Sequence, residues 1–197
     1  MSLDIKYYMK GMYYEITYLI TDKATGLQAV IDPGYFGNDV RKDIPAGDNL
    51  KYMLLTHGHH DHFLAAQQYL DEYKNLTFAV PQGDAELIKS EPYNCPEPDV
   101  LLKEGDIITL GETELRVIET PGHTGGGICF LTDKELFSGD TLFKLSVGRT
   151  DLPTGDWDTL LHSITEKLYT LDEDLAVFPG HGLPTTIGYE KRANPFV

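Results

Sequence analysis

Four of the seven histidines in this chain lie within six residues, in the segment THGHHDH at positions 56–62. Side chains alternate along an extended strand, so His57 and His59 point to one face and can bind one metal ion. The chain must then turn, and Asp61 and His62 approach from another backbone direction, where they can bind a second ion. Imidazole and carboxylate groups suit zinc, iron or manganese. The segment therefore predicts a site for two divalent metal ions.

Three further residues of the same chemical types complete the expected set. His123 lies in TPGHT, Asp140 in SGD and His181 in PGH, and in each case a preceding glycine lets the turn hold the side chain near the others. Two such ions need about four ligands each when solvent is counted. Independent histidines need not fall at successive strand ends, so we interpret the set as one site. We expect His60 to be exposed or to support the site, and His162 to be a surface or packing residue.

The elements that must position these residues are short strands and helices in a mixed order. Apolar patterning predicts strands over residues 15–20, 27–32, 50–55, 76–80, 106–110, 114–120, 128–132, 135–138 and 175–178, and helices over 63–73, 83–90 and 157–171. Four of the strands end in the polar turns that carry His or Asp, and a rigid sheet often presents a site on such loops. The Pro-rich segment 91–98 (EPYNCPEP) predicts a surface loop. We interpret residues 1–3 as a cloning remnant with no role.

Length and composition indicate one globular domain spanning residues 1–197. The net charge of −15 opposes a nucleic-acid partner, although a metal pair can still make one pocket attractive to a small anion. No apolar run approaches the roughly 18–20 residues of a membrane span, and the N-terminus lacks a secretory signal pattern. With only two cysteines and no CxxC, the expected location is the cytoplasm. The sequence does not predict the oligomeric state.

The ordered set HxHxDH, TPGHT, SGD and PGH resembles the metallo-β-lactamase superfamily, from about residue 14 to residue 184. The resemblance implies an α+β fold, a four-layer αβ/βα sandwich with metal ions at the edge between two sheets. It also implies two metal positions and a bridge: His57, His59 and His123 on one ion, Asp61, His62 and His181 on the other, and Asp140 between them. Asp32 in VIDPG matches an aspartate that supports the ligands from behind, although Asp-Pro-Gly is also a turn signal by itself.

Within that superfamily the chain is most similar to the glyoxalase II group of hydroxyacylglutathione hydrolases. Asp140 stands where one β-lactamase subclass carries cysteine, and GRTD at 148–151 resembles a segment of short, single-domain members. Full-length glyoxalase II enzymes add a C-terminal helical domain that grips glutathione, which we expect this chain to lack. Arg149 and Lys144 are the cations expected to contact an anionic thiol carrier. A salt bridge with Asp151 is an equally expected role for Arg149.

The expected reaction is hydrolysis of a small acyl thioester. Two cations about 3.5–4 Å apart can lower the pKa of a shared water to near 7, and the resulting hydroxide attacks the carbonyl carbon. Asp61 is the expected catalytic residue, which orients the hydroxide or accepts its proton. A thiolate has a parent pKa near 8.5 and leaves without strong acid help, and the sequence shows no obvious extra acid. Two zinc ions are the expected cofactors, with iron or manganese as alternatives.

The same residues leave other functions open. Persulfide dioxygenases also carry a GRTD-like segment and use a single iron, for which His57, His123 and Asp140 are the candidate ligands. A lactonase and then a β-lactamase are further alternatives, while the charge of −15 opposes a nuclease. A metal-binding redox module is the non-enzymatic alternative.

Overall fold

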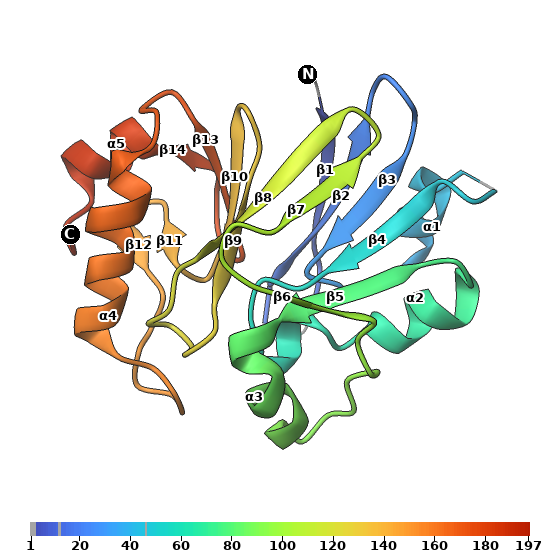
Figure 1. The fold of residues 1–197 in the computed structure, drawn as a ribbon, viewed down its shortest axis with the longest axis horizontal. Coiled ribbons are helices and arrows are strands. Elements are labelled where there is room, and N and C mark those ends of the chain that lie inside the picture. The colour runs from blue at the N-terminus through green and yellow to red at the C-terminus, as the bar shows by residue number, and fades with distance from the viewer. Residues whose placement is uncertain (1–2, 12, 46) are drawn as a thin grey trace.

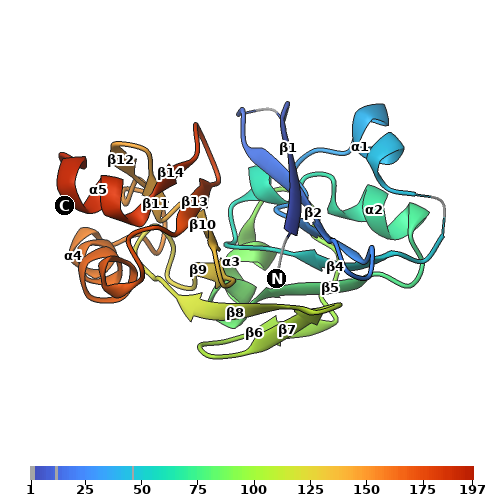
Figure 2. The same cartoon turned by 90° about the horizontal axis from the view of Figure 1, so that it is seen from above.

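The computed structural model describes residues 3–11, 13–45 and 47–197, which form four layers (Figure 1). Two six-stranded sheets face each other in the middle, and helices cover the outer face of each. Figure 2 shows the same layers from above, with α4 and α5 at one end and α1 and α2 at the other. The expected αβ/βα sandwich is confirmed.

The first sheet carries the N-terminal half, in the strand order β1-β2-β3-β4-β5-β6. Its strands are β1 (Leu3–Met9), β2 (Ile16–Asp22), β3 (Gln28–Ile31), β4 (Leu50–Leu54), β5 (Thr77–Pro81) and β6 (Val100–Leu102). The first three strands pair antiparallel, and the last four pair parallel. Parallel neighbours need crossover connections, which here contain α1 (Asn38–Asp43), α2 (Ala66–Glu72) and α3 (Ala85–Ser90). Short 3₁₀ turns at His60–His62 and Gln82–Asp84 precede α2 and α3.

The second sheet carries the C-terminal half, in the order β14-β13-β10-β9-β8-β7. Its strands are β7 (Ile107–Leu110), β8 (Thr113–Glu119), β9 (Ile128–Leu131), β10 (Glu135–Gly139), β13 (Ala176–Pro179) and β14 (Thr185–Thr186), and a hairpin of β11 (Leu142–Phe143) and β12 (Ser146–Val147) follows β10. Only β10 and β13 pair parallel. The outer layer contains α4 (Trp157–His162), continued by helical turns to Thr170, and α5 (Ile187–Ala193).

Apolar side chains fill the space between the sheets and between each sheet and its helices. The central core joins Tyr18 of the first sheet to Phe130 and Phe137 of the second. The rings of Tyr18 and Phe137 meet edge to face at 5.4 Å, and the Tyr18 hydroxyl donates to the carbonyl of Pro179 at 2.6 Å. The two sheets are therefore held as one unit by packing and by a buried hydrogen bond. None of the described helices has the length and apolar content that a membrane span requires.

Most expected elements are confirmed, with ends that shift by one to a few residues. The long helical pattern over 157–171 is one continuous helical segment, and residues 91–98 form no helix or strand. The interpretation of residues 1–3 is wrong for Leu3, which begins β1 opposite Asp22 and is only 9% exposed. The other two residues of that triplet lie outside the described residues. Strand β1 escaped prediction because Asp4 and Lys6 interrupt its apolar pattern at the edge of the sheet.

The central core predicts a large loss of stability on truncating its largest side chains. Phe130→Ala should lower the free energy of unfolding by about 3–5 kcal/mol, because the ring is fully buried between the sheets. Phe196→Ala is the matched control, since that ring is 51% exposed, and it should change stability by less than about 0.5 kcal/mol. Urea unfolding followed by circular dichroism measures both values, and equal effects would contradict this assignment of the core.

Candidate metal centre

The four loops that carry the candidate ligands meet at one rim, between the ends of β4, β8, β10 and β13. Backbone hydrogen bonds connect these loops across the two sheets. The amide of Ile128 donates to the Thr56 carbonyl at 2.8 Å, and the amide of Gly180 donates to the Gly139 carbonyl at 2.8 Å. The Gly180 carbonyl in turn accepts from the amide of Ile16 in β2 at 2.8 Å. The rim is therefore fixed by main-chain contacts before any ligand binds.

The structure brings all seven expected metal-binding residues together. Their nitrogen and oxygen atoms lie within 4.8 Å of one another in three overlapping groups: His57, His59 and His123; His57, His62 and Asp140; Asp61, His62 and His181. The first and third groups have the composition expected for the two metal positions. Asp140 lies between them, with Oδ1 3.6 Å from Nε2 of His62 and Oδ2 3.5 Å from Nε2 of His123.

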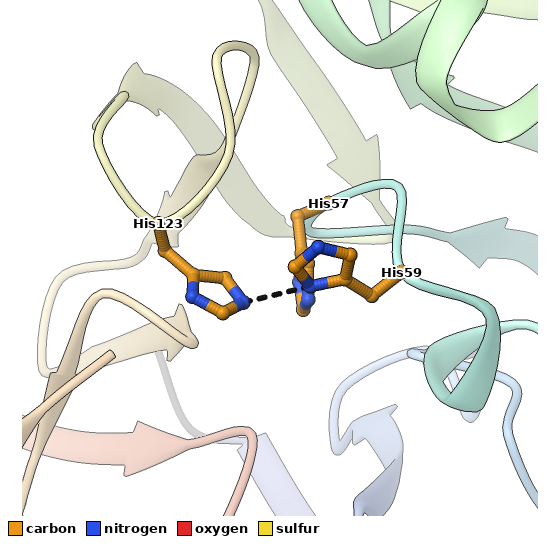
Figure 3. Close-up of side chains that lie close together, drawn as sticks. All are labelled: His57, His59 and His123. Atoms are coloured by element: carbon orange, nitrogen blue, oxygen red, sulfur yellow. Dashed lines mark hydrogen bonds between the residues drawn. The ribbon is translucent and has the colours of Figure 1, made fainter. Parts of the chain in front are cut away.

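Figure 3 shows how the first group converges from distant parts of the chain. His57 and His59 project from the loop after β4, and His123 projects toward them from the loop after β8. Nδ1 of His59 and Nε2 of His123 approach to 2.9 Å. Two imidazole nitrogens this close need a shared proton or a shared cation, and either keeps their lone pairs from repelling.

Hydrogen bonds behind the rings fix which nitrogen faces the cluster. His123 Nδ1 donates to the carbonyl of Arg149 at 2.6 Å, so in the neutral ring the lone pair lies on Nε2, which faces Asp140. The Thr56 hydroxyl donates to Asp32, so it can only accept from Nδ1 of His57, 3.1 Å away. Both rings therefore present an Nε2 lone pair to the cluster, as a metal ligand must.

Asp32 lies behind the candidate ligands, where it contacts Thr56 and His62. It is buried and has a positive φ of 53°, and Oδ1 accepts from the Thr56 amide at 2.8 Å. Oδ2 accepts from the Thr56 hydroxyl at 2.8 Å and lies 3.0 Å from Nδ1 of His62. One carboxylate thus orients His62 directly and His57 through Thr56, so the turn residue also positions two candidate ligands.

The cluster fits divalent metal ions, because several of its buried polar atoms have no hydrogen-bond partner among the described residues. These atoms are Nε2 of His57, His59 and His62 and Oδ1 of Asp140. An unpaired buried polar atom costs free energy that a coordinated cation removes. The donor set, imidazole with carboxylate, is one that zinc, iron and manganese accept.

The first group, His57, His59 and His123, has a protonation state that suits a cation. Burial lowers the pKa of His57 well below its ordinary value, and the neighbouring imidazoles lower it further. The same causes bring the pKa of His59 to about 3. Both rings are therefore neutral at physiological pH, which is the protonation state that binds metal.

The third group, Asp61, His62 and His181, balances imidazole against carboxylate. Burial acts to lower the pKa of His62, but the charges of Asp140 and Asp32 outweigh it and raise the pKa to about 10. Burial acts to raise the pKa of Asp61, but contact with His181 and the charge of His62 outweigh it and hold this pKa below its ordinary range. Protons here occupy the place that a cation would take, so metal binding should release them.

The two expected substrate-binding cations lie differently with respect to the site. The cluster opens onto a cavity of about 390 Å³, and Arg149 lines it. Arg149 also forms the salt bridge expected for its alternative role, with Asp151 at 2.6 and 2.7 Å. Lys144 is exposed and is not part of the cavity wall, and His162 is exposed on α4, as expected.

His60 lines the same cavity and contacts two residues of the segment 91–98. Its Nδ1 lies 2.9 Å from Oε2 of Glu91, and its ring stacks on Tyr93 with centroids 4.6 Å apart. Its side chain is only partly exposed. Of the two expectations for His60, a supporting position at the site describes it better than an exposed one.

Asp84 is a positioning residue that the sequence analysis missed. It is fully buried at the start of α3 and accepts three hydrogen bonds: from the amides of Gly58 at 2.8 Å and Gly126 at 2.7 Å, and from the Thr124 hydroxyl at 2.6 Å. The carboxylate thereby ties the loop of His57 and His59 to the loop that follows His123. The local sequence QGD shows only an ordinary helix start, so no local signal could reveal this role.

Comparison with known proteins identifies relatives over nearly the whole chain. The model of the metallo-beta-lactamase superfamily matches residues 16–181. Hydroxyacylglutathione hydrolase GloC of Haemophilus influenzae is 40% identical over 183 residues, which cover 86% of each chain. Among solved structures, BLEG-1 B3 metallo-beta-lactamase has a TM-score of 0.87 at 30% identity, covering 98% of this chain and 99% of its own. TTHA1623 in a di-iron-bound form has a TM-score of 0.82 at 31% identity, covering 98% and 100%.

The close packing around Gly180 predicts that a single methyl group disturbs the cluster. The Cβ of Gly180→Ala would lie 2.2 Å from Oδ1 of Asp140 and 2.8 Å from the His62 ring. We expect the variant to bind divalent metal about 10–100-fold more weakly than the wild type, because both candidate ligands must move. Gly125→Ala is the control, since its Cβ meets nothing closer than 3.4 Å. Metal titration of the folded apo-proteins decides, and equal affinities of the two variants would refute the expectation.

The Asp84 hydrogen bonds predict a loss of stability as well. Asp84→Ala leaves three donors without an acceptor, and at about 1 kcal/mol each the free energy of unfolding should fall by roughly 3 kcal/mol. Asp158→Ala removes an exposed carboxylate and should change it by less than about 0.5 kcal/mol. Urea unfolding in the presence of a chelator provides the comparison. An Asp84→Ala protein as stable as the control would show that the carboxylate does not hold the loops.

Proposed function

The chain belongs to the metallo-beta-lactamase superfamily, and from this premise we propose that it hydrolyses small acyl thioesters of the hydroxyacylglutathione type. One observation carries the proposal: the convergence of five imidazoles and two carboxylates, several with unpaired buried atoms, at the floor of an open cavity. The relative from Haemophilus influenzae, a hydroxyacylglutathione hydrolase by name, supports the choice of thioester.

We assign the cofactor as two divalent metal ions. His57, His59 and His123 would hold one ion, Asp61, His62 and His181 the other, and Asp140 would contact both. Zinc is our first assignment, and the di-iron form of TTHA1623 supports iron as the alternative. Divalent cations held by these residues would polarise a bound carbonyl group and lower the pKa of nearby water.

The residues of the chain itself supply position and proton transfer. The Asp61 carboxylate faces the cavity and lies 3.5 Å from Nε2 of His181, where it can accept a proton from the attacking water. The hydrogen bonds that His62 donates to Asp32 and that His123 donates to the Arg149 carbonyl hold the two rings, so little reorganisation accompanies the reaction. A departing thiolate needs no strong acid, which matches a cavity whose carboxylates are Asp61 and Asp140 of the cluster and Glu91, which is paired with His60.

The substrate would lie across the cluster, with its thiol carrier toward the rim formed by Arg149, Leu152 and Pro153. The Arg149 guanidinium is exposed there and forms an ion pair with Asp151. Because its charge is already paired, we expect it to contact the thiol carrier mainly through directional hydrogen bonds. Lys144 lies outside the cavity wall, and we still predict that it contacts the part of the thiol carrier that extends beyond the cavity.

Asp61→Asn tests the proposed proton transfer. We expect kcat/KM for S-lactoylglutathione to fall at least about 100-fold, because an amide cannot accept the proton. Asp158→Asn is the matched control, an exposed carboxylate changed in the same way, and should keep wild-type activity. Thiol release measured by a colorimetric thiol reagent, with metal analysis of each protein, provides the readout.

Failure of the proposed function has a distinct signature in the same assay. A metal-replete wild-type protein that releases no thiol from any small acyl thioester would overturn thioester hydrolysis. One iron per chain, with oxygen uptake on addition of a persulfide, would assign the site to a persulfide dioxygenase instead.

A further inference from the structure

A second cavity, of about 360 Å³, lies beneath the Pro-rich segment 91–98, beside α3 (Figure 1, green). Its wall mixes apolar and polar side chains from β5, α3, the segment itself and β6. The apolar part includes Val80, Ile88, Tyr93, Cys95, Pro96 and Leu101, and the polar part includes Lys89, Glu91, Asn94 and Glu97. A cavity of this size and lining suits a small organic group. The proposed thioester chemistry at the metal cluster gives it no role.

This cavity adjoins the one above the metal cluster. Glu91 lines both cavities, and the ring of His60 in the first stacks on the ring of Tyr93 in the second. The pair between His60 and Glu91, at 2.9 Å, completes this shared wall. A single layer of side chains, His60, Glu91 and Tyr93, therefore separates the two cavities, and a substituent on a molecule bound at the cluster can enter the second cavity where this layer parts.

The charges around the second cavity select against anions. Its titratable side chains include Glu91 and Glu97, while Lys89 pairs with Glu86 on the same helix at 3.1 Å. Burial, with the nearby charge of Glu97, raises the pKa of the Cys95 thiol to about 12, so this sulfur is neutral. An uncharged alkyl group fits this lining, and a carboxylate or phosphate does not.

We propose that the second cavity is an acyl-chain subsite, which receives the uncharged alkyl end of an acyl group whose thioester carbonyl lies at the metal cluster. The proposal rests on the proposed thioester hydrolysis and extends it from small hydroxyacyl groups to simple acyl thioesters, among which it names medium-chain ones as preferred. The acyl group then points toward residues 91–98, and the thiol carrier points the opposite way, toward Arg149. The segment 91–98 and α3 would then determine which acyl length the protein prefers.

The proposal predicts how rate depends on acyl length. For acetyl, butanoyl, hexanoyl and octanoyl thioesters of one thiol, kcat/KM of the metal-loaded wild type should rise at least about tenfold from acetyl to hexanoyl. Ala85→Phe places a ring in the cavity from α3, so the ratio of hexanoyl to acetyl kcat/KM should fall to about one. Ala193→Phe is the matched control, an exposed helical alanine in α5, and should keep the wild-type ratio.

A second variant keeps the test informative if Ala85→Phe fails to fold. Leu101→Ala widens the cavity at an already exposed side chain, so the preferred acyl length should move from hexanoyl toward octanoyl. A wild-type ratio near one, or a raised ratio that Ala85→Phe and Leu101→Ala both leave unchanged, would overturn the proposal.

A binding measurement separates this proposal from the proposed reaction. Hexanamide, which is neutral and carries no thioester, should bind the metal-loaded protein in saturation-transfer NMR, and Ala85→Phe but not Ala193→Phe should abolish the signal. Absence of binding to the wild type would overturn the subsite. Binding to a protein that hydrolyses none of the thioesters would overturn the reaction alone and support the cavity as an apolar binding site.

Discussion

Buried nitrogen and oxygen atoms that have no hydrogen-bond partner in the described part of the chain face one another at the rim between the two sheets, and the rest of the structure is organised around them. Such atoms cost free energy in a folded chain unless a cation coordinates them. The chain maintains this arrangement because the sheets are fixed by a dense core and their loops by main-chain hydrogen bonds, such as that between Ile128 and Thr56. The rigid scaffold keeps these polar atoms unpaired, and the unpaired atoms give the site its affinity for metal.

Two buried carboxylates carry that rigidity to the ligands. Asp32 orients His62 directly and His57 through Thr56, and Asp84 ties the loop of His57 to the loop after His123. Neither acid needs to touch substrate to matter for the reaction. Because each accepts several hydrogen bonds in a dry environment, each fixes a geometry that exposed side chains could not hold.

The sequence predicted the parts of the site whose signal is local. His57, His59, Asp61 and His62 share one short motif, and the remaining candidates follow strands with clear apolar patterns. Other parts depend on contacts between distant segments, and no local pattern reports those. Asp84 meets Gly126 across 42 residues, and the wall of His60, Glu91 and Tyr93 joins a motif to an irregular loop. Helix α5 was missed because it is short and contains Gly188, which weakens a helical pattern.

We infer that the seven side chains hold two cations in the arrangement that the loops impose. Anomalous X-ray diffraction from crystals of the metal-loaded protein tests this directly. We expect two peaks, one among His57, His59 and His123 and the other among Asp61, His62 and His181, with Asp140 contacting both. A single peak, or peaks away from this rim, would contradict it.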